Sequence, residues 1–154
     1  MNNNTIAKIE ELKEYLKKIE YLHSSMALLQ WDSVVYMPKD AIEYRSEMLG
    51  YLTGESYKLT TSDQMKEFID YFGGVDDLDD LAKSMLENIR RDYDYATKIP
   101  EAEYVQYEID KALSQHAWEE AKKADDFEIF KPHLAKMIAY NKKHAEYWGF
   151  AENK

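Results

Sequence analysis

The stretch QWDSVVYMP, residues 30–38, separates two long helical patterns and resembles neither of them. Apolar residues before it recur every three or four positions, as on one helix face: Ile6, Ile9, Leu12, Leu16, Ile19, Leu22, Met26 and Leu29. Pro38 cannot continue a helix but can open one, and the helical period resumes from Ala41 to Leu52. The β-branched and aromatic residues at 33–37 therefore predict an extended corner between two helices.

Within this stretch, Trp31 stands next to Asp32. A large aromatic ring at a corner suggests a buried anchor, and a short carboxylate beside it suggests a cap for nearby backbone amides. We therefore expect Trp31 to be buried and Asp32 to hydrogen-bond the backbone.

The rest of the chain continues in helical periods without any strand pattern. Thr61 followed by Gln64 is typical of a capping box, the Gly73-Gly74 pair ends a helix, and Asp76 or Asp77 would cap the next one. The expected helices cover residues 5–30, 38–58, 63–72, 76–98, 100–123 and 132–148, the last ending before Gly149. The fourth carries Leu78, Leu81, Met85, Ile89 and Tyr93 on one face. The fold class is therefore all-α, with five or six bundled helices in a single helical domain over residues 1–154.

Composition excludes several classes of function. Thirty acidic and 20 basic residues give a net charge of −10, which opposes binding to nucleic acid or to anionic membranes. The chain has no Cys, which rules out disulfides and thiolate metal sites. No apolar run approaches the roughly 20 residues of a membrane span, and the first residues do not resemble a signal peptide. We expect a cytoplasmic protein.

The four histidines, at positions 23, 116, 133 and 144, do not form a recognisable metal motif. No two are four residues apart, as the helical zinc-peptidase motif requires. Glu20 and His23 have the spacing of a di-iron element, but no second such element exists, so an ordinary interfacial His23 is the simpler interpretation. His116 and Glu120 are neighbours on one helix face, and an exposed pair is the simpler interpretation there too.

Other active-site patterns are also missing. The acidic clusters at residues 76–80 and 92–94 lack the Gly turn and closing Glu of a calcium loop. Gly73-Gly74 lacks the Lys-Ser or Lys-Thr of a phosphate loop, and no nucleophile elbow occurs. We therefore assign no catalytic, cofactor-binding or metal-binding residue in this chain.

Three ordered blocks resemble the amino-terminal region of the Taq-type zinc metallocarboxypeptidases. The first is Trp31-Asp32 followed by Tyr36-Met37-Pro38, Ala41 and Arg45. The second is NIRRDYDYATKIP, residues 88–100, which looks like the family's Ile-Arg-Arg-Asp-Tyr segment. The third is SQHAW, residues 114–118, followed by Ala121, Asp126-Phe127, Phe130, Pro132 and Leu134. Ser33-Val34-Val35 and Lys39-Asp40 depart from the family pattern, which leaves the geometry of that loop open.

The resemblance implies one part of a long, almost wholly helical peptidase. The family's His-Glu-x-x-His zinc helix has no counterpart here, so zinc belongs to the full-length parent and no cofactor is expected in this chain. The amino-terminal helices would form one wall and the lid side of a groove for peptide substrates, and members of the family commonly form homodimers. We expect the chain alone to be inactive.

A second hypothesis is a stand-alone helical interaction module derived from the same scaffold. In either case, a helix face that normally packs on the missing part would be exposed. The tyrosine- and methionine-rich faces are candidates for self-association through an apolar patch, with Tyr104, Tyr107 and Met137 as examples.

Overall fold

The computed structural model describes residues 3–149, which form six α-helices and one short 3₁₀ turn with no strand in this range. The helices are α1 (Asn3–Val35), α2 (Ile42–Thr60), α3 (Asp63–Gly73), α4 (Asp80–Ala96), α5 (Glu101–Ala124) and α6 (Phe127–Trp148). The 3₁₀ turn, Lys39–Ala41, leads into α2. The all-α prediction with five to six helices is confirmed.

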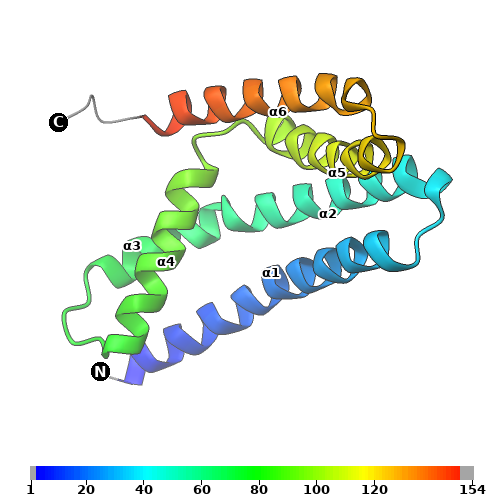
Figure 1. The fold of residues 1–154 in the computed structure, drawn as a ribbon. Coiled ribbons are helices and arrows are strands. Elements are labelled where there is room, and N and C mark those ends of the chain that lie inside the picture. The colour runs from blue at the N-terminus through cyan, green and yellow to red at the C-terminus, as the bar shows by residue number, and fades with distance from the viewer. Residues whose placement is uncertain (1–2, 150–154) are drawn as a thin grey trace.

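Helices α1, α2, α5 and α6 pack in this order, each on the next, and the shorter helices α3 and α4 lie at one end of them (Figure 1). Helix α2 packs between α1 and α5, and α5 packs against α6. Helices α3 and α4 pack on each other beside the amino-terminal part of α1. None of the described helices has a stretch long and apolar enough to cross a membrane.

The main hydrophobic core lies at the end of the molecule where α1, α3 and α4 meet. Its largest fully buried side chains include Leu12 of α1 and Phe68 of α3. Tyr15 packs on Phe68 with ring centroids 5.8 Å apart, and its hydroxyl donates to the Leu59 carbonyl oxygen at 2.9 Å. The apolar face predicted for the first helix therefore forms the core from Ile9 to Ile19, whereas Ile6, at its start, is exposed.

Small residues allow α2 and α5 to approach closely. Ser46, Gly50, Thr53 and Gly54 are buried on α2, and a Cβ on Gly50 would lie only 2.6 Å from Ile109 Cδ1 on α5. Non-bonded carbon atoms prefer separations of about 3.5–4.0 Å, so a larger side chain at Gly50 requires the Ile109 side chain or the two helices to shift.

The predicted extended corner at residues 33–37 is wrong at its start. Helix α1 continues to Val35, and the Ser33 hydroxyl donates to the Leu29 carbonyl oxygen at 2.8 Å within the helix. The amides of Tyr36 and Met37 both donate to the Asp32 carbonyl oxygen at 2.9 Å, which closes the helix before Pro38. Local hydrogen bonds thus override the extended preference of the β-branched residues.

The predicted roles of Trp31 and Asp32 are also wrong. The Trp31 side chain is 57% exposed and contacts only the nearby Tyr36 ring among the described aromatic pairs, at 5.7 Å. The Asp32 carboxylate does not cap a backbone amide; it forms an ion pair with Arg45. The helical register turns Trp31 outwards, because the buried face of α1 follows other positions.

Helix starts differ from the predicted ones by up to five residues. Ser62, not Thr61, caps α3, since its hydroxyl accepts from the Met65 amide at 3.1 Å. Asp79, not Asp76 or Asp77, caps α4 by accepting from the Ala82 amide at 2.8 Å.

The start of the last helix also precedes the predicted one. Pro132 does not open it: α6 begins at Phe127, where Asp126 accepts from the Glu128 amide at 3.0 Å, and Pro132 lies inside it. At α3 and α4, several capping residues stand close together and backbone geometry selects one. At α6, a proline that was expected to open the helix lies inside it instead.

The predicted apolar face of the fourth helix is partly wrong. Leu81 is 81% exposed, whereas Leu78 and Ala82 are buried in the core. Met85, Ile89 and Tyr93 do pack against that core as partly buried residues. The later start of α4 explains the difference, because Leu78 precedes the helix and does not share its period.

Candidate functional site

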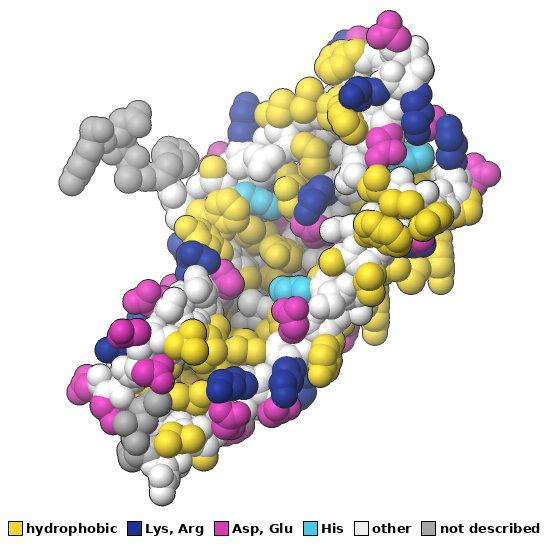
Figure 2. All heavy atoms as spheres, turned by 60° about the horizontal axis from the view of Figure 1, so that its bottom comes forward, with side chains coloured by type: hydrophobic (Ala, Val, Ile, Leu, Met, Phe, Trp, Pro, Cys, Tyr) yellow, Lys and Arg dark blue, Asp and Glu magenta, His cyan; other side chains and the backbone are white. Residues whose placement is uncertain are grey.

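A groove runs along α2 between α1 and α5, in three adjoining sections. The sections at the two ends have volumes of about 460 and 50 Å³, and the middle one about 230 Å³. His23, Ser56 and Tyr104 line both the widest and the middle section, and Gln30 and Glu108 line both the middle and the narrow section. The sections therefore join into one groove. Figure 2 shows a face of the molecule that is hollowed near its centre, with hydrophobic side chains in the hollow.

The widest section is walled by aromatic rings in two pairs. Tyr57 and Tyr104 have ring centroids 5.3 Å apart, and Tyr95 and Trp148 also lie 5.3 Å apart in an edge-to-face arrangement. The Trp148 indole nitrogen donates to the Tyr95 carbonyl oxygen at 3.3 Å, which holds the end of α6 against the end of α4. Among the described residues that line this section, Asp92 alone carries a formal charge at neutral pH.

The middle section is lined by polar side chains that are largely paired. The His23 ring nitrogen Nε2 lies 2.9 Å from the Ser56 hydroxyl oxygen, which links α1 to α2. The Thr53 hydroxyl donates to the Met26 sulfur at 3.4 Å. His23 is thus an interfacial histidine, as the sequence indicated, and Glu20 accepts from Ser24 on its own helix.

The narrow section carries more charge than the other two. The Arg45 guanidinium is held by Asp32, and the Lys111 ammonium donates to Glu108 at 2.8 Å. His116 also lines this section. Its expected neighbour Glu120 instead pairs with Lys39 at 3.0 Å. Both His116 and Glu120 are half-buried rather than exposed, and within residues 3–149 no hydrogen bond or ion pair joins them.

Carboxylates surround the tyrosines of the widest section. Burial raises the pKa of the Tyr104 phenol, and the negative charges of Glu108 and Asp92 raise it further. Burial likewise raises the pKa of Tyr57, with a further contribution from Glu101. The Tyr57 hydroxyl donates to the Ile99 carbonyl oxygen at 2.7 Å, which orients its ring along the groove.

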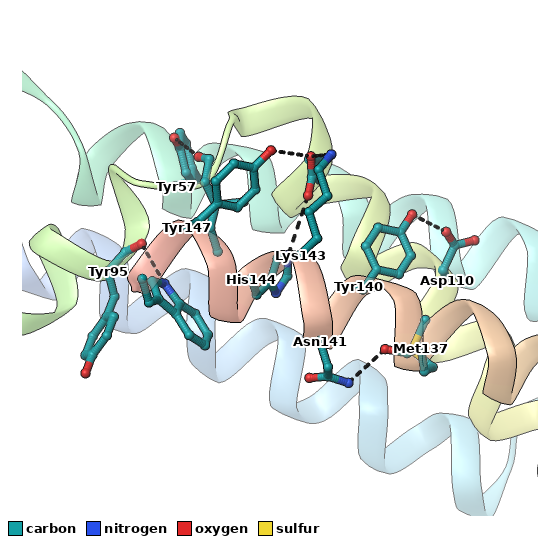
Figure 3. A network of polar contacts seen from close by, with 12 residues as sticks. Tyr57, Tyr95, Asp110, Met137, Tyr140, Asn141, Lys143, His144 and Tyr147 are labelled. Atoms are coloured by element: carbon teal, nitrogen blue, oxygen red, sulfur yellow. Dashed lines mark hydrogen bonds and ion pairs between the residues drawn. The ribbon is translucent and has the colours of Figure 1, made fainter. Parts of the chain in front are cut away.

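Helix α6 is fixed to α5 by two carboxylates, the buried Asp110 and the half-buried Glu103, shown in part in Figure 3. Asp110 accepts from Lys136 and from the Tyr140 hydroxyl, both at 2.7 Å. Burial raises the pKa of Asp110, but these two hydrogen bonds lower it more, so that it lies below its ordinary value. Burial and the bond to Asp110 raise the pKa of Tyr140 to about 12.

The second carboxylate, Glu103, lies seven residues before Asp110 on α5. Its Oε2 accepts from Lys143 at 2.5 Å and from Tyr147 at 3.1 Å. Burial raises the pKa of Glu103, but hydrogen bonds from Lys143 and Tyr147 bring it below its ordinary value. Its other oxygen, Oε1, lies 3.9 Å from His144 Nε2, and neither atom has a hydrogen-bond partner among the described residues.

The remaining residues singled out in the sequence lie on α5 and α6, where the rings of Tyr107 and His144 are in contact, with centroids 5.0 Å apart. His133 is half-buried on α6, and His144 is buried among the rings of Tyr107, Tyr140 and Trp148. Tyr107 and Met137 are both half-buried, and the Tyr107 ring packs between α5 and α6. Within residues 3–149, no group of three or more His, Asp or Glu side chains could hold a metal ion.

The sequence did not indicate that Glu103 and Asp110 join α5 to α6, or that Asp92 lines the groove. Glu103 and Asp110 are seven residues apart, which places them on one face of α5. That spacing could be seen in the sequence, but acidic residues on a helix are usually exposed. Their partners on α6 are 26 to 44 residues away in the chain, so no local pattern identifies them.

Residues 11–154 match the family described as carboxypeptidase Taq (M32) metallopeptidase. The chain is 39% identical over 145 residues to carboxypeptidase 1 of Bacillus subtilis, covering 94% of this chain and 29% of that protein. It is 31% identical over 150 residues to thermostable carboxypeptidase 1 of Pyrococcus furiosus, covering 97% of this chain and 30% of the relative.

Solved structures show the same similarity. The crystal structure of BsuCP superposes with a TM-score of 0.91 at 38% identity, over 96% of this chain and 30% of that one. The structure of Pyrococcus furiosus carboxypeptidase Apo-Mg superposes with a TM-score of 0.75 at 28% identity, over 99% and 30%. The chain thus spans about 30% of the length of the proteins that it matches.

Proposed function

Because this chain belongs to the carboxypeptidase Taq (M32) metallopeptidase family, we propose that its helices form one wall and the lid side of a peptide-binding groove in a metallocarboxypeptidase. The observation that carries the proposal is the continuous groove along α2, between α1 and α5. Ligand sites are concave and mostly apolar, with a few placed polar groups, and the widest section fits this description.

The proposed parent removes carboxy-terminal residues from peptides with the help of a zinc ion. Residues 3–149 do not fit a metal site, since they bring no three candidate ligands together. The role that we assign to them is therefore to bind the peptide and to limit access to it. The chain alone is expected to release no amino acids from peptides.

The proposal is tested with the protein expressed from its complete coding sequence, read on past Lys154. This protein is incubated with amino-terminally blocked dipeptides, and the released amino acid is measured with and without a metal chelator. We expect release that the chelator abolishes. A protein without hydrolytic activity would overturn the proposal and favour the stand-alone interaction module.

A substitution in the groove tests the role of this chain in that activity. Gln30 is exposed and lines both the middle and the narrow section, so Gln30→Trp fills the groove. We expect the KM for peptides to rise several-fold, because a ligand-binding surface is lost. Gln64→Trp on α3 is the matched control, since Gln64 is exposed and lines none of the three sections. Equal kinetics for both variants would contradict the groove-wall role.

A further inference from the structure

The widest section of the groove has the size of a ligand pocket. Its volume of about 460 Å³ falls in the range of roughly 300–1,000 Å³ that is typical of small-molecule and side-chain sites. Ile89, Ile99 and Met65 lie among its apolar lining residues. This section therefore has room for a whole side chain of a bound peptide.

The walls favour a flat, positively charged group. Tyr57, Tyr104, Tyr95 and Trp148 present aromatic rings from α2, α4, α5 and α6. The faces of aromatic rings attract cations, and a planar guanidinium also stacks on them. Four rings from four helices around one section thus suit the end of an arginine side chain.

The charged groups that act on this section are negative, which complements a positively charged side chain. Asp92 is the one charged residue among the described residues that line the section, and Glu108 and Glu101 act on the two tyrosines of its wall. Two lysines near the walls already have partners. Lys58 donates to Glu55 at 2.9 Å, and Lys98 donates to the Trp148 carbonyl oxygen at 3.4 Å.

Asp92 remains available to a ligand despite one neighbouring cation. Arg91 Nε lies 3.6 Å from Asp92 Oδ1, but the two side chains are 61% and 64% exposed. Exposed ion pairs of this kind contribute little and exchange readily with other partners. A guanidinium held by the aromatic walls can therefore compete for the Asp92 carboxylate.

We propose that the widest section of the groove is a specificity pocket for an arginine side chain of a bound peptide, with Asp92 as the charged contact and the four aromatic rings as its walls. This proposal rests on the proposed function, because it requires that a peptide lie in the groove. An apolar side chain would gain from the same walls but not from Asp92, so charge is the property that the test must isolate.

The test measures binding of blocked peptides to the 154-residue chain by the fluorescence of Trp148. Trp31→Phe and Trp118→Phe leave Trp148 as the sole tryptophan of the three in the chain. The peptides are acetyl-Ala-X-Ala-amide, in which X is arginine, its neutral analogue citrulline, or glutamate. We expect the arginine peptide to bind about five- to tenfold more tightly than the citrulline peptide, and the glutamate peptide most weakly.

Two variants test whether Asp92 supplies the negative charge that favours the arginine peptide. Asp92→Asn should reduce the preference for arginine over citrulline by about two- to fivefold, because the aromatic rings still attract the guanidinium. Asp94→Asn is the matched control, because Asp94 is an exposed acid on the same helix that does not line the pocket, and it should keep the preference. As a second readout, the preference in the unsubstituted pocket should shrink when salt is raised to about 1 M, where charges are screened over about 3 Å.

Three results would overturn the proposal: equal binding of the arginine and citrulline peptides, a preference that Asp92→Asn does not reduce, or no binding of any peptide. The first two leave the groove-wall function standing, since that is decided separately by hydrolysis and by Gln30→Trp in the full-length protein. Circular dichroism of each variant confirms that its helices are intact before binding is compared.

Discussion

Arg45 on α2 joins the end of α1 to the start of α2 through its guanidinium. Its Nη2 lies 2.6 Å from Asp32 Oδ2, and its Nη1 donates to the Leu29 carbonyl oxygen at 3.1 Å. The carbonyl of Leu29 also accepts from Ser33. Three side chains thus fix the last turns of α1, and the direction in which α2 returns along the groove depends on them.

We predict that Arg45→Met destabilises the fold by about 1 kcal/mol. The substitution keeps the aliphatic stem but removes a partly exposed ion pair and a hydrogen bond to a backbone carbonyl. Urea unfolding followed by circular dichroism measures the loss. Arg91→Met, which removes an exposed pair, is the control and should change the free energy of unfolding by less than about 0.5 kcal/mol. Equal losses would show that the Arg45 contacts contribute nothing specific.

The helices could be predicted because apolar residues recur at intervals of three or four positions over many turns. Leu12 and Ile19, for example, belong to one long apolar period, and both are buried. Helix starts were less predictable, because three potential caps, such as Asp76, Asp77 and Asp79, stand close together. Which of these side chains caps the helix depends on the local backbone geometry, and tertiary packing determines that geometry.

The candidate site was predictable only as a family resemblance. The groove takes lining residues from all six helices, with Met65 contributed by α3, and one sequence does not state which helix faces lie together. Trp31 shows the limit of local reasoning, since it was expected to be buried and is exposed. Asp92 looked like part of a solubilising acidic cluster, and only its place beside Tyr104 distinguishes it.

The close approach of α2 and α5 gives a second prediction. Gly50→Ala should destabilise the fold by roughly 1–3 kcal/mol, because its Cβ would clash with Ile109 Cδ1. Thermal unfolding monitors the effect. Gly73→Ala is the control, since a Cβ there meets no atom within 4 Å. In a protein that already carries Ile109→Ala, Gly50→Ala should cost much less stability than it does alone. An equal cost in both backgrounds would show that the clash is not the cause.

The Asp110 network predicts a dependence of stability on acid pH. The folded-state pKa of Asp110 lies below its ordinary value of 3.8, so its contribution is present above about pH 4 and is lost as pH falls through the folded-state pKa. We expect Asp110→Asn to cost roughly 1–3 kcal/mol at pH 6, and this cost should shrink towards pH 3.

Urea unfolding of both proteins across that pH range provides the measurement. Asp94→Asn serves as the baseline for removing one exposed negative charge. A cost of Asp110→Asn that is constant between pH 6 and pH 3 would mean that the ionised carboxylate does not supply the stabilisation.

The start of α3 gives the last prediction. Ser62→Ala removes the acceptor of the Met65 amide and a contact of 2.7 Å with the Tyr15 hydroxyl, so it should destabilise the fold by about 1 kcal/mol or more. Thr61→Ala removes only a hydroxyl that donates back to the Tyr57 carbonyl, and it should cost less than about 0.5 kcal/mol. Chemical unfolding compares the two. A larger cost for Thr61→Ala would restore Thr61 as the cap and would contradict the hydrogen bond from Met65 to Ser62.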